Sequence, residues 1–275
     1  MNSHTLKYPK SHQISLGLGA LLLIVFAIYT VSDDMLMALA SSAFGIVLAA
    51  ASISETTTIE YGEQEVTIRG LFRQEQSFRW SDIESVRPKA LGGGLRLLDN
   101  GENKLLNLDT NMVGAEHFIG KLGDQRAHLF RSTLGENIVQ NPVFMLASTV
   151  IIMGFGLVFL FVMGPNYGFL GTGIGIALLA AGIVFLGGST REIRFEKDRL
   201  VTKSLVKTRE FKVDDLKAIV LKLFVASRGQ REYQVILAPK EGKARPIQIM
   251  GYNKFMLYLQ LRVWFKAVSG EAGIA

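Results

Sequence analysis

The chain has 275 residues, a net charge of +6 and a mean hydropathy of +0.28, and 20% of its residues are charged although 49% are apolar. A uniform soluble domain seldom combines such values, so we expect membrane-embedded and aqueous segments in one chain. The lack of cysteine excludes disulfides, thiolate metal sites and thiol nucleophiles. The four histidines have no metal-binding spacing and no HExxH motif, so we expect no metal and no cofactor.

Four apolar runs without a charged residue predict four membrane-spanning helices. Each has about 18–20 residues, close to the number that a helix needs to cross about 30 Å of hydrocarbon. They pair into two hairpins, residues 14–53 and 142–188, and Gly164-Pro165-Asn166 is a turn signal inside the second. The four runs are residues 14–31, 35–53, 143–162 and 169–188.

The first apolar run has a competing interpretation as a cleaved signal peptide. Lys7 and Lys10 precede it, and residues 38–40 are similar to a cleavage site. An acidic pair at 33–34 interrupts the run before that site, however, and apolar sequence continues to Ile53. We therefore expect an uncleaved hairpin.

The distribution of basic residues orients the hairpins. Lys7 and Lys10 precede the first span, and Arg191 and Arg194 follow the last, whereas the hairpin connections contain no lysine or arginine. Because basic residues stay on the cytoplasmic side, both termini, including residues 1–13, and both polar segments are expected there. The predicted location is the inner membrane of a bacterium.

The spans contain no ionisable residue, which argues against an ion pathway, a proton-coupled carrier or an intramembrane protease. Small residues instead recur at fourfold spacing, and such spacing lets helices approach closely. The contact that they serve lies either within one chain or at an interface between chains. These residues are Ser41, Gly45 and Ala49, and Gly171 and Gly175.

The segment after the first hairpin, residues 54–141, predicts a small β-rich module. β-branched and aromatic residues at 56–72 surround a turn signal at Gly62-Glu63, which predicts two strands. Leucine-rich runs flank Asp99-Asn100-Gly101, a strong hairpin signal. Gly92–Gly94 predicts a flexible connection, since it lacks the lysine and the helix start of a phosphate loop.

A closing amphipathic helix follows in that module, and the segment 189–275 repeats the whole plan. We expect about six short strands in each module, forming a small curled sheet whose open end is closed by the helix. Apolar residues at helical spacing predict the two helices. They are Ala115, Phe118, Ile119, Leu122, Leu129 and Phe130, and then Tyr252, Phe255, Met256, Leu259 and Val263.

The two halves correspond position by position, which predicts an internal repeat. Ile59, Tyr61, Val66 and Leu71 match Ile193, Phe195, Leu200 and Leu205 at an offset of 134. The offset then becomes 133 and holds for Phe78, Trp80, Asp82, Ile83 and Val86, which match Phe211, Val213, Asp215, Leu216 and Ile219.

The chain has a hairpin of spans, the Ile-x-Tyr pattern at Ile59, the segment Phe-x-Trp-x-Asp-Ile-x-x-Val from Phe78 to Val86, and a final helix. In these features it resembles bacterial membrane proteins with PH-like domains. Here the hairpin and domain occur in tandem, and Val213 stands where Trp80 does. The resemblance implies modules that bind lipid headgroups, peptides or proteins, without enzymatic activity. It transfers no site residue, because the matching positions are structural and a fold alone does not give a function.

The two modules differ in charge. Residues 55–141 contain 10 basic and 13 acidic residues, a net charge of −3, whereas residues 191–275 contain 18 and 9, a net charge of +9. Basic clusters beside a membrane attract anionic headgroups, although positive-inside retention explains part of this charge. The candidate residues for binding a headgroup or an acidic partner are Arg194, Lys203, Lys207, Arg209 and Lys212.

These patterns predict a non-enzymatic binding or scaffolding protein that associates with itself or with another membrane or cytoplasmic protein. Two alternatives remain open, a sensor of anionic lipid headgroups and a component of a membrane conduit or transporter. No nucleophile with a base at a suitable spacing supports catalysis. The basic module also lacks a recognisable aromatic motif for binding nucleic acid.

Overall fold

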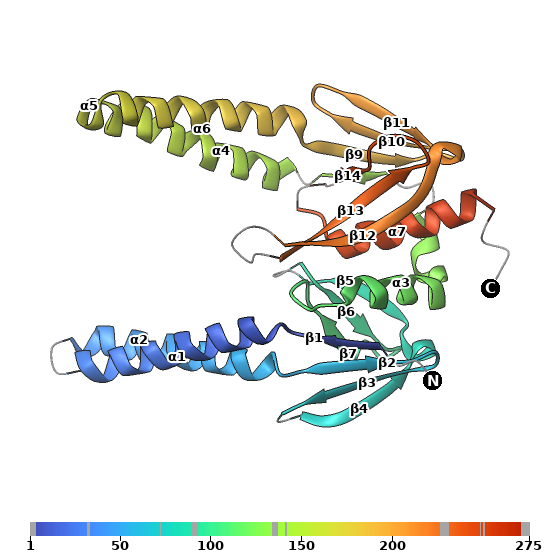
Figure 1. The fold of residues 1–275 in the computed structure, drawn as a ribbon, viewed down its shortest axis with the longest axis horizontal. Coiled ribbons are helices and arrows are strands. Elements are labelled where there is room, and N and C mark those ends of the chain that lie inside the picture. The colour runs from blue at the N-terminus through green and yellow to red at the C-terminus, as the bar shows by residue number, and fades with distance from the viewer. Residues whose placement is uncertain are drawn as a thin grey trace. The chain divides into compact units, whose positions relative to one another are not determined.

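A computed structural model describes residues 4–31, 34–71, 73–89, 93–133, 137–140, 142–225, 231–247, 249 and 251–270. The chain divides into two compact units, Met1–Arg126 and Ala127–Ala275. In each unit, a pair of long helices runs away from a group of short strands (Figure 1). Parts of the predicted connections, namely residues 32, 33, 72, 92 and 141, lie outside the described residues.

The first unit places its helix pair between its first and second strands. Its described elements are β1 (His4–Lys7), α1 (Lys10–Thr30), α2 (Met35–Ser54), β2 (Thr58–Tyr61), β3 (Glu65–Gly70), β4 (Arg73–Arg79), the 3-10 turn η1 (Trp80–Asp82), β5 (Ser85–Pro88), β6 (Leu95–Leu98), β7 (Lys104–Leu108) and α3 (Ala115–Gln125).

The second unit begins with a 3-10 helix and then follows the same order of elements. They are η2 (Ala127–Thr133), β8 (Ile138–Val139), α4 (Pro142–Val158), the π-helical turn η3 (Phe159–Met163), α5 (Gly164–Tyr167), α6 (Phe169–Gly188), β9 (Thr190–Phe195), β10 (Arg199–Ser204), β11 (Thr208–Lys212), η4 (Val213–Asp215), β12 (Leu216–Val225), β13 (Arg231–Pro239), β14 (Arg245–Ile247) and α7 (Lys254–Val268).

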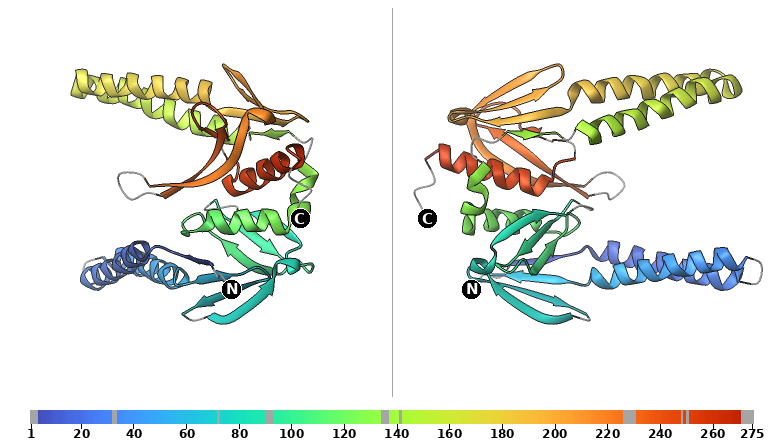
Figure 2. Two further views of the ribbon diagram at one scale, coloured as in Figure 1. Left: turned by 45° about the vertical axis from the view of Figure 1, so that its right-hand side comes forward. Right: turned by 180° about the vertical axis from the view of Figure 1, so that it is seen from behind.

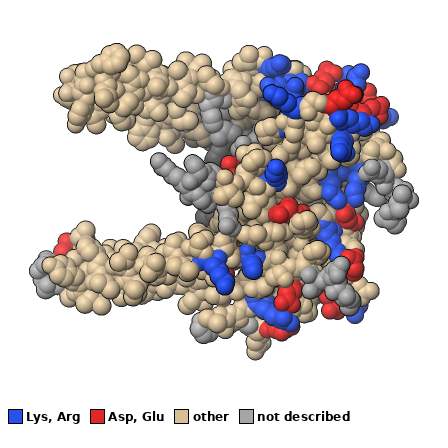
Figure 3. All heavy atoms as spheres, in the orientation of Figure 1, with Lys and Arg blue, Asp and Glu red and all other residues tan. Residues whose placement is uncertain are grey.

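Four helices among the described residues are long and apolar enough to cross a membrane, which confirms the four predicted helices and indicates a multi-pass membrane protein. They are Lys10–Thr30, Met35–Ser54, Leu146–Tyr167 and Phe169–Gly188. The members of each pair lie side by side in every view (Figure 2). Large apolar side chains on them are exposed, as a lipid-facing surface requires. Charged side chains gather over the strands instead (Figure 3).

The predicted turn at Gly164-Pro165-Asn166 is wrong. The helix continues to Tyr167, and the chain reverses at Gly168, whose φ of +57° suits glycine. Proline normally breaks a helix, because it lacks an N–H and its ring clashes with the preceding turn. Here the π-helical turn η3 precedes it, with Gly164 N–H donating to Phe159 O, and this wider turn accommodates the proline.

Among the described residues, each unit contains two antiparallel sheets rather than the single curled sheet that the sequence suggests. The larger sheets have the orders β1-β2-β3-β4 and β8-β9-β10-β11, and the smaller ones are β5-β6-β7 and β12-β13-β14. The strand before each hairpin therefore pairs with the strand after it, with Leu6 opposite Ile59 and Ile138 opposite Ile193. The sequence missed β1 and β8, because strands of four and two residues are too short to show alternation.

Two tryptophans donate hydrogen bonds to corresponding carbonyls in the two units, although they come from different elements. In the first unit, Trp80 Nε1 donates to the carbonyl of Gly62 at 3.2 Å. In the second unit, Val213 takes the place of Trp80, and Trp264 of α7 donates from Nε1 to the carbonyl of Glu196 at 2.9 Å. Glu196 lies 134 positions after Gly62, so the missing indole is supplied from the closing helix.

The closing helices α3 and α7 bury the apolar residues that the sequence assigns to them, including Phe118 and Phe255. The predicted stripe of the first helix is too long, however. α3 ends at Gln125, because Arg126 leaves the helical conformation, and Phe130 is buried in the separate 3-10 helix η2, which contacts α7 in the second unit.

Candidate functional site

Four of the five predicted cations lie on the two faces of the sheet β8-β9-β10-β11, and the fifth lies in a turn at its edge. Side chains alternate along a strand, and the register puts Glu192 opposite Lys203, Ile193 opposite Thr202, and Thr202 opposite Arg209. Arg194, Lys203 and Lys212 therefore share the outer face, whereas Arg209 shares the inner face with Thr202. Lys207 lies in the turn between β10 and β11.

Ion pairs already neutralise part of the outer face. Arg194 Nε lies 2.5 Å from Glu192 Oε1, and this contact lowers the pKa of Glu192. Lys203 Nζ lies 4.0 Å from the same carboxylate, while Lys212 makes no ion pair among the described residues. The structure therefore does not bring all five cations together into one site.

A cavity of about 420 Å³ brings Lys207 and Arg209 together, and we call it the α6–hairpin pocket. It lies within the second unit, between the last turns of α6 and the β10–β11 hairpin. Neither cation makes an ion pair among the described residues. Two unpaired positive charges in one pocket favour an anionic ligand.

Hydroxyl groups and apolar side chains complete the lining of the α6–hairpin pocket. Thr190, Thr202 and Ser204 supply hydroxyls from the strands, and Ile183 and Val184 supply an apolar wall from α6. The sequence did not single out these residues. Alternation along β10 could have linked Thr202 and Ser204 to one face, but the approach of α6 is a tertiary contact.

Local contacts hold the pocket's walls. Ser204 Oγ accepts from Lys207 N–H at 3.0 Å and donates to Lys207 O at 2.9 Å, which closes the turn of the hairpin. A Cβ at Gly187 of α6 would lie 3.1 Å from Val206 Cγ2, so the glycine lets helix and turn approach closely. A Cβ at the next residue, Gly188, would meet only open space.

The first unit has a different surface at the corresponding place. Its register pairs Ile68 with Gln76, where the second unit pairs Thr202 with Arg209. Ile68 is fully buried, and glutamine carries no charge. The pair of Thr202 and Arg209 is therefore a property of the second unit, whereas Lys207 has a basic counterpart in Arg73 at the offset of 134.

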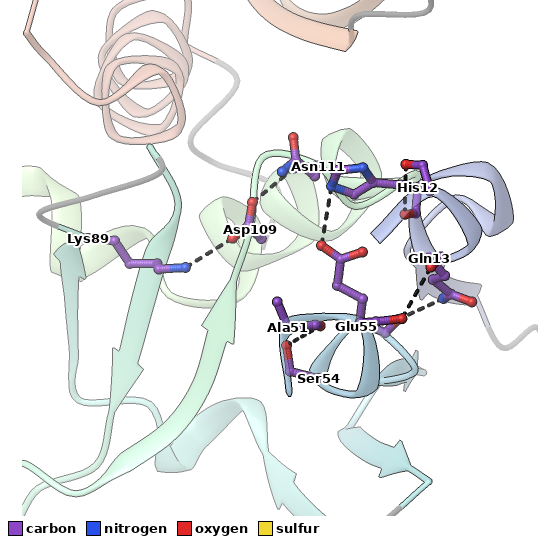
Figure 4. Close-up of polar contacts among 10 residues, drawn as sticks. His12, Gln13, Ala51, Ser54, Glu55, Lys89, Asp109 and Asn111 are labelled. Atoms are coloured by element: carbon purple, nitrogen blue, oxygen red, sulfur yellow. Dashed lines mark hydrogen bonds and ion pairs between the residues drawn. The ribbon is translucent and has the colours of Figure 1, made fainter. Parts of the chain in front are cut away.

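The root of the first hairpin contains a different polar cluster, shown in Figure 4. Glu55 follows the last residue of α2 and is buried, and its Oε1 lies 3.2 Å from His12 Nε2 on α1. Gln13 Nε2 donates to the carbonyl of Glu55 at 2.7 Å, and Ser52 Oγ donates to the carbonyl of Gln13 at 3.1 Å. These contacts join the start of α1 to the end of α2.

Burial dominates the electrostatics of this cluster. Burial raises the pKa of Glu55. Nearby His12 has a smaller, lowering effect on this pKa, and nearby Asp109 has a smaller, raising effect. Glu55 Oε2 is buried without a hydrogen-bond partner among the described residues. Asp109 itself pairs with Lys89 at 3.0 Å, and burial raises the pKa of neighbouring Tyr8 as well. The contacts of Glu55 and Gln13 suit a structural link between the start of α1 and the end of α2.

No group of three or more histidine or acidic side chains could hold a metal ion among the residues that the structure describes. Comparisons of the chain with protein-family models, with curated proteins and with solved structures found no match. The functional assignment therefore depends on the geometry of the two units.

Proposed function

We propose that this chain is a multi-pass protein of the bacterial inner membrane that works by binding, without catalysis, through two PH-like modules on the cytoplasmic face. The matching order of elements and the indole bonds to Gly62 and Glu196 support an internal duplication. The pairing of β1 with β2 and of β8 with β9 makes each helix pair continuous with its sheet. Each module is thereby held at the membrane surface.

One observation carries the binding role of the second module. Its unpaired cations Lys207 and Arg209 lie beside the end of α6, where a membrane-spanning helix leaves the hydrocarbon. Anionic headgroups attract basic residues near the surface with about 1 kcal/mol per charge. We therefore propose that the second module senses anionic groups at the cytoplasmic membrane surface, and that the first module does not.

A matched pair of labels tests this proposal. Leu71 and Leu205 correspond at the offset of 134 and lie at the tips of equivalent hairpins, and both are exposed. Leu71→Cys and Leu205→Cys, each carrying a fluorophore, change no charge in a chain without native cysteine. The measurement is the quenching of each fluorophore by spin-labelled lipid, with the full-length protein in nanodiscs. The host lipid is neutral or anionic, and the salt concentration is low or high.

Quenching at Leu205 is expected to increase with anionic lipid and to decrease with salt, because salt screens charges at a surface. Quenching at Leu71 is expected to stay constant. The same response at both positions, or no response to lipid charge at either, would contradict the proposed role of the second module.

The opposite net charges of the two segments favour self-association as a second role. Residues 55–141 carry −3 and residues 191–275 carry +9, so modules of neighbouring chains have complementary charge. Native mass spectrometry of protein extracted together with its lipid is expected to show an oligomer that dissociates as salt increases. A monomer at every salt concentration would exclude this second role.

A further inference from the structure

We propose that the α6–hairpin pocket binds one anionic phospholipid, with its phosphate at the two cations and one acyl chain along α6. This inference rests on the proposed function, because it requires α6 to cross the membrane. It adds a defined site and a ligand class to a general attraction for anionic surfaces.

The polar half of the pocket suits a phosphate group. Arg209 offers a planar guanidinium that can donate two parallel hydrogen bonds to phosphate oxygens, and Lys207 adds a second positive charge. The hydroxyl of Thr190 lies in the same lining and can donate to a remaining oxygen or to the ester linkage, whereas Thr202 Oγ1 donates to the Arg209 carbonyl at 3.5 Å and helps to hold that strand. Two cations exceed the single charge of a phosphodiester, so the lining favours an anionic lipid over a zwitterionic one.

The apolar half distinguishes a lipid from a soluble phosphate ester. Ile183 and Val184 lie in the last two turns of α6, and Val184 is 73% exposed. Val206 faces the same pocket from the turn and is 79% exposed. A soluble phosphate would leave this apolar wall in water, whereas an acyl chain that descends from the headgroup would cover it.

The size of the pocket fits part of a lipid. About 420 Å³ lies within the range of cavities that hold small ligands, roughly 300–1,000 Å³. Such a volume takes a headgroup and the upper part of one chain, and the rest of the lipid stays in the bilayer. The stoichiometry is therefore one lipid for each chain.

Native mass spectrometry of full-length protein from nanodiscs that contain phosphatidylglycerol and phosphatidylcholine tests the site. One phosphatidylglycerol is expected to remain bound at a collision energy that removes the other lipids. Lys207→Gln with Arg209→Gln removes both pocket cations and is expected to lower this retention roughly 30-fold, as the loss of two surface charges implies. Lys240→Gln with Lys243→Gln removes two exposed charges elsewhere in the same module and is expected to retain the lipid.

A third variant tests the pocket without changing charge. Gly188→Leu places a side chain into open space in the lining, so it fills the pocket with little strain on the fold. Retention of phosphatidylglycerol is expected to fall, while thermal unfolding in phosphatidylcholine nanodiscs stays as in the unchanged protein. Soluble glycerol 3-phosphate at millimolar concentration is expected to leave the bound lipid in place.

Three results would overturn the inference: equal retention in all variants, equal loss in the control pair, or full displacement by glycerol 3-phosphate, which would assign the site to a soluble phosphate ester. The tests of this site and of the proposed function fail separately. If quenching at Leu205 does not depend on lipid charge, the proposed function is wrong. If that dependence is present but the pocket variants retain phosphatidylglycerol as the original protein does, only the lipid site is wrong.

Discussion

At the scale of single residues, the two indoles show how one structural need is met from two places in the chain. Trp80 and Trp264 are both buried, and each donates to the carbonyl that follows the strand after its hairpin. Trp264→Phe keeps most of the bulk but removes the N–H, which leaves the Glu196 carbonyl without this partner. We expect a loss of about 1–3 kcal/mol in the free energy of unfolding, measured by thermal or denaturant unfolding of the full chain.

Tyr167→Phe is the control for this change, because it removes one polar group from an exposed aromatic side chain. It is expected to leave stability unchanged. If the free energy of unfolding is the same for Trp264→Phe, the control and the original protein, the indole hydrogen bond contributes nothing to the stability of the second unit.

Glu55 gives a prediction about pH. Burial raises its pKa from an ordinary value of 4.5, so between the two values the folded chain holds a proton that the unfolded chain releases. The stability contributed by Glu55 is therefore present below pH 4.5 and is lost as pH rises through the raised pKa. Glu55→Gln removes this titration and is expected to raise the melting temperature at neutral pH relative to the original protein, with a difference that shrinks in acid.

Glu241→Gln, at an exposed position of the second unit, controls for the loss of one acidic residue. Melting temperatures of the three proteins across pH 4 to 8 check the prediction. A Glu55→Gln variant that loses stability at neutral pH by more than in acid would show that the His12 contact outweighs the burial of the carboxylate.

The predicted site could be foreseen only in part at this scale. Alternation along β9 to β11 indicates which cations share a face, but it does not show which of the five have an acidic partner. The structure separates Lys207 and Arg209 from Arg194 and Lys203, because Glu192 pairs with the latter two. The hydroxyls of the pocket and the cluster at Glu55 depend on contacts between distant segments, which a periodicity does not contain.

At the scale of elements, the glycines of the second hairpin explain how α6 packs. A Cβ at Gly175 would lie 2.8 Å from Leu160 N and 2.9 Å from Gly156 O. A Cβ at Gly173, half a turn away, would meet nothing within 4 Å. Gly171 and Gly175 thus serve packing inside the second hairpin, which is one of the two interpretations that the sequence left open for them.

Gly175→Ala is expected to force the helices apart and to lower the free energy of unfolding by about 1–3 kcal/mol. Gly173→Ala is the matched control and is expected to be neutral or slightly stabilising, because alanine favours a helix by about 1 kcal/mol over glycine. Thermal unfolding in nanodiscs compares the two. Equal effects would indicate that the close approach at Gly175 does not support the hairpin.

Elements were the best predicted part of this chain. Uncharged apolar runs of sufficient length leave few alternatives to a helix. The hairpin predicted at Asp99-Asn100-Gly101 does connect β6 and β7. The Asp99 carboxylate accepts from the N–H groups of Gly101 and Asn103, each at 2.8 Å. The errors arise where a local signal meets a tertiary constraint. Pro165 is accommodated by a π turn, and β1 and β8 exist because they pair with strands beyond a long hairpin.

At the scale of the whole molecule, we propose that two membrane hairpins hold both modules on one side of a membrane. Each unit contributes an even number of described spans, so the strands on either side of a hairpin must share a side if the helices cross. The basic residues near the spans favour the cytoplasmic side, which is the orientation that we propose. Anionic lipids are enriched in the cytoplasmic leaflet. If the chain were inserted in the opposite orientation, the α6–hairpin pocket would lie at the other leaflet.

The most direct test is the labelling of single cysteines in intact cells with a maleimide that does not cross membranes, since the native chain has no cysteine. Asn166→Cys lies in an exposed position at the far end of the second hairpin, and Lys104→Cys and Lys240→Cys lie on exposed positions of the two modules. We predict that Asn166→Cys is labelled in intact cells and that the other two are labelled only after lysis. Labelling of either module from outside, or protection of position 166, would contradict the shared cytoplasmic location.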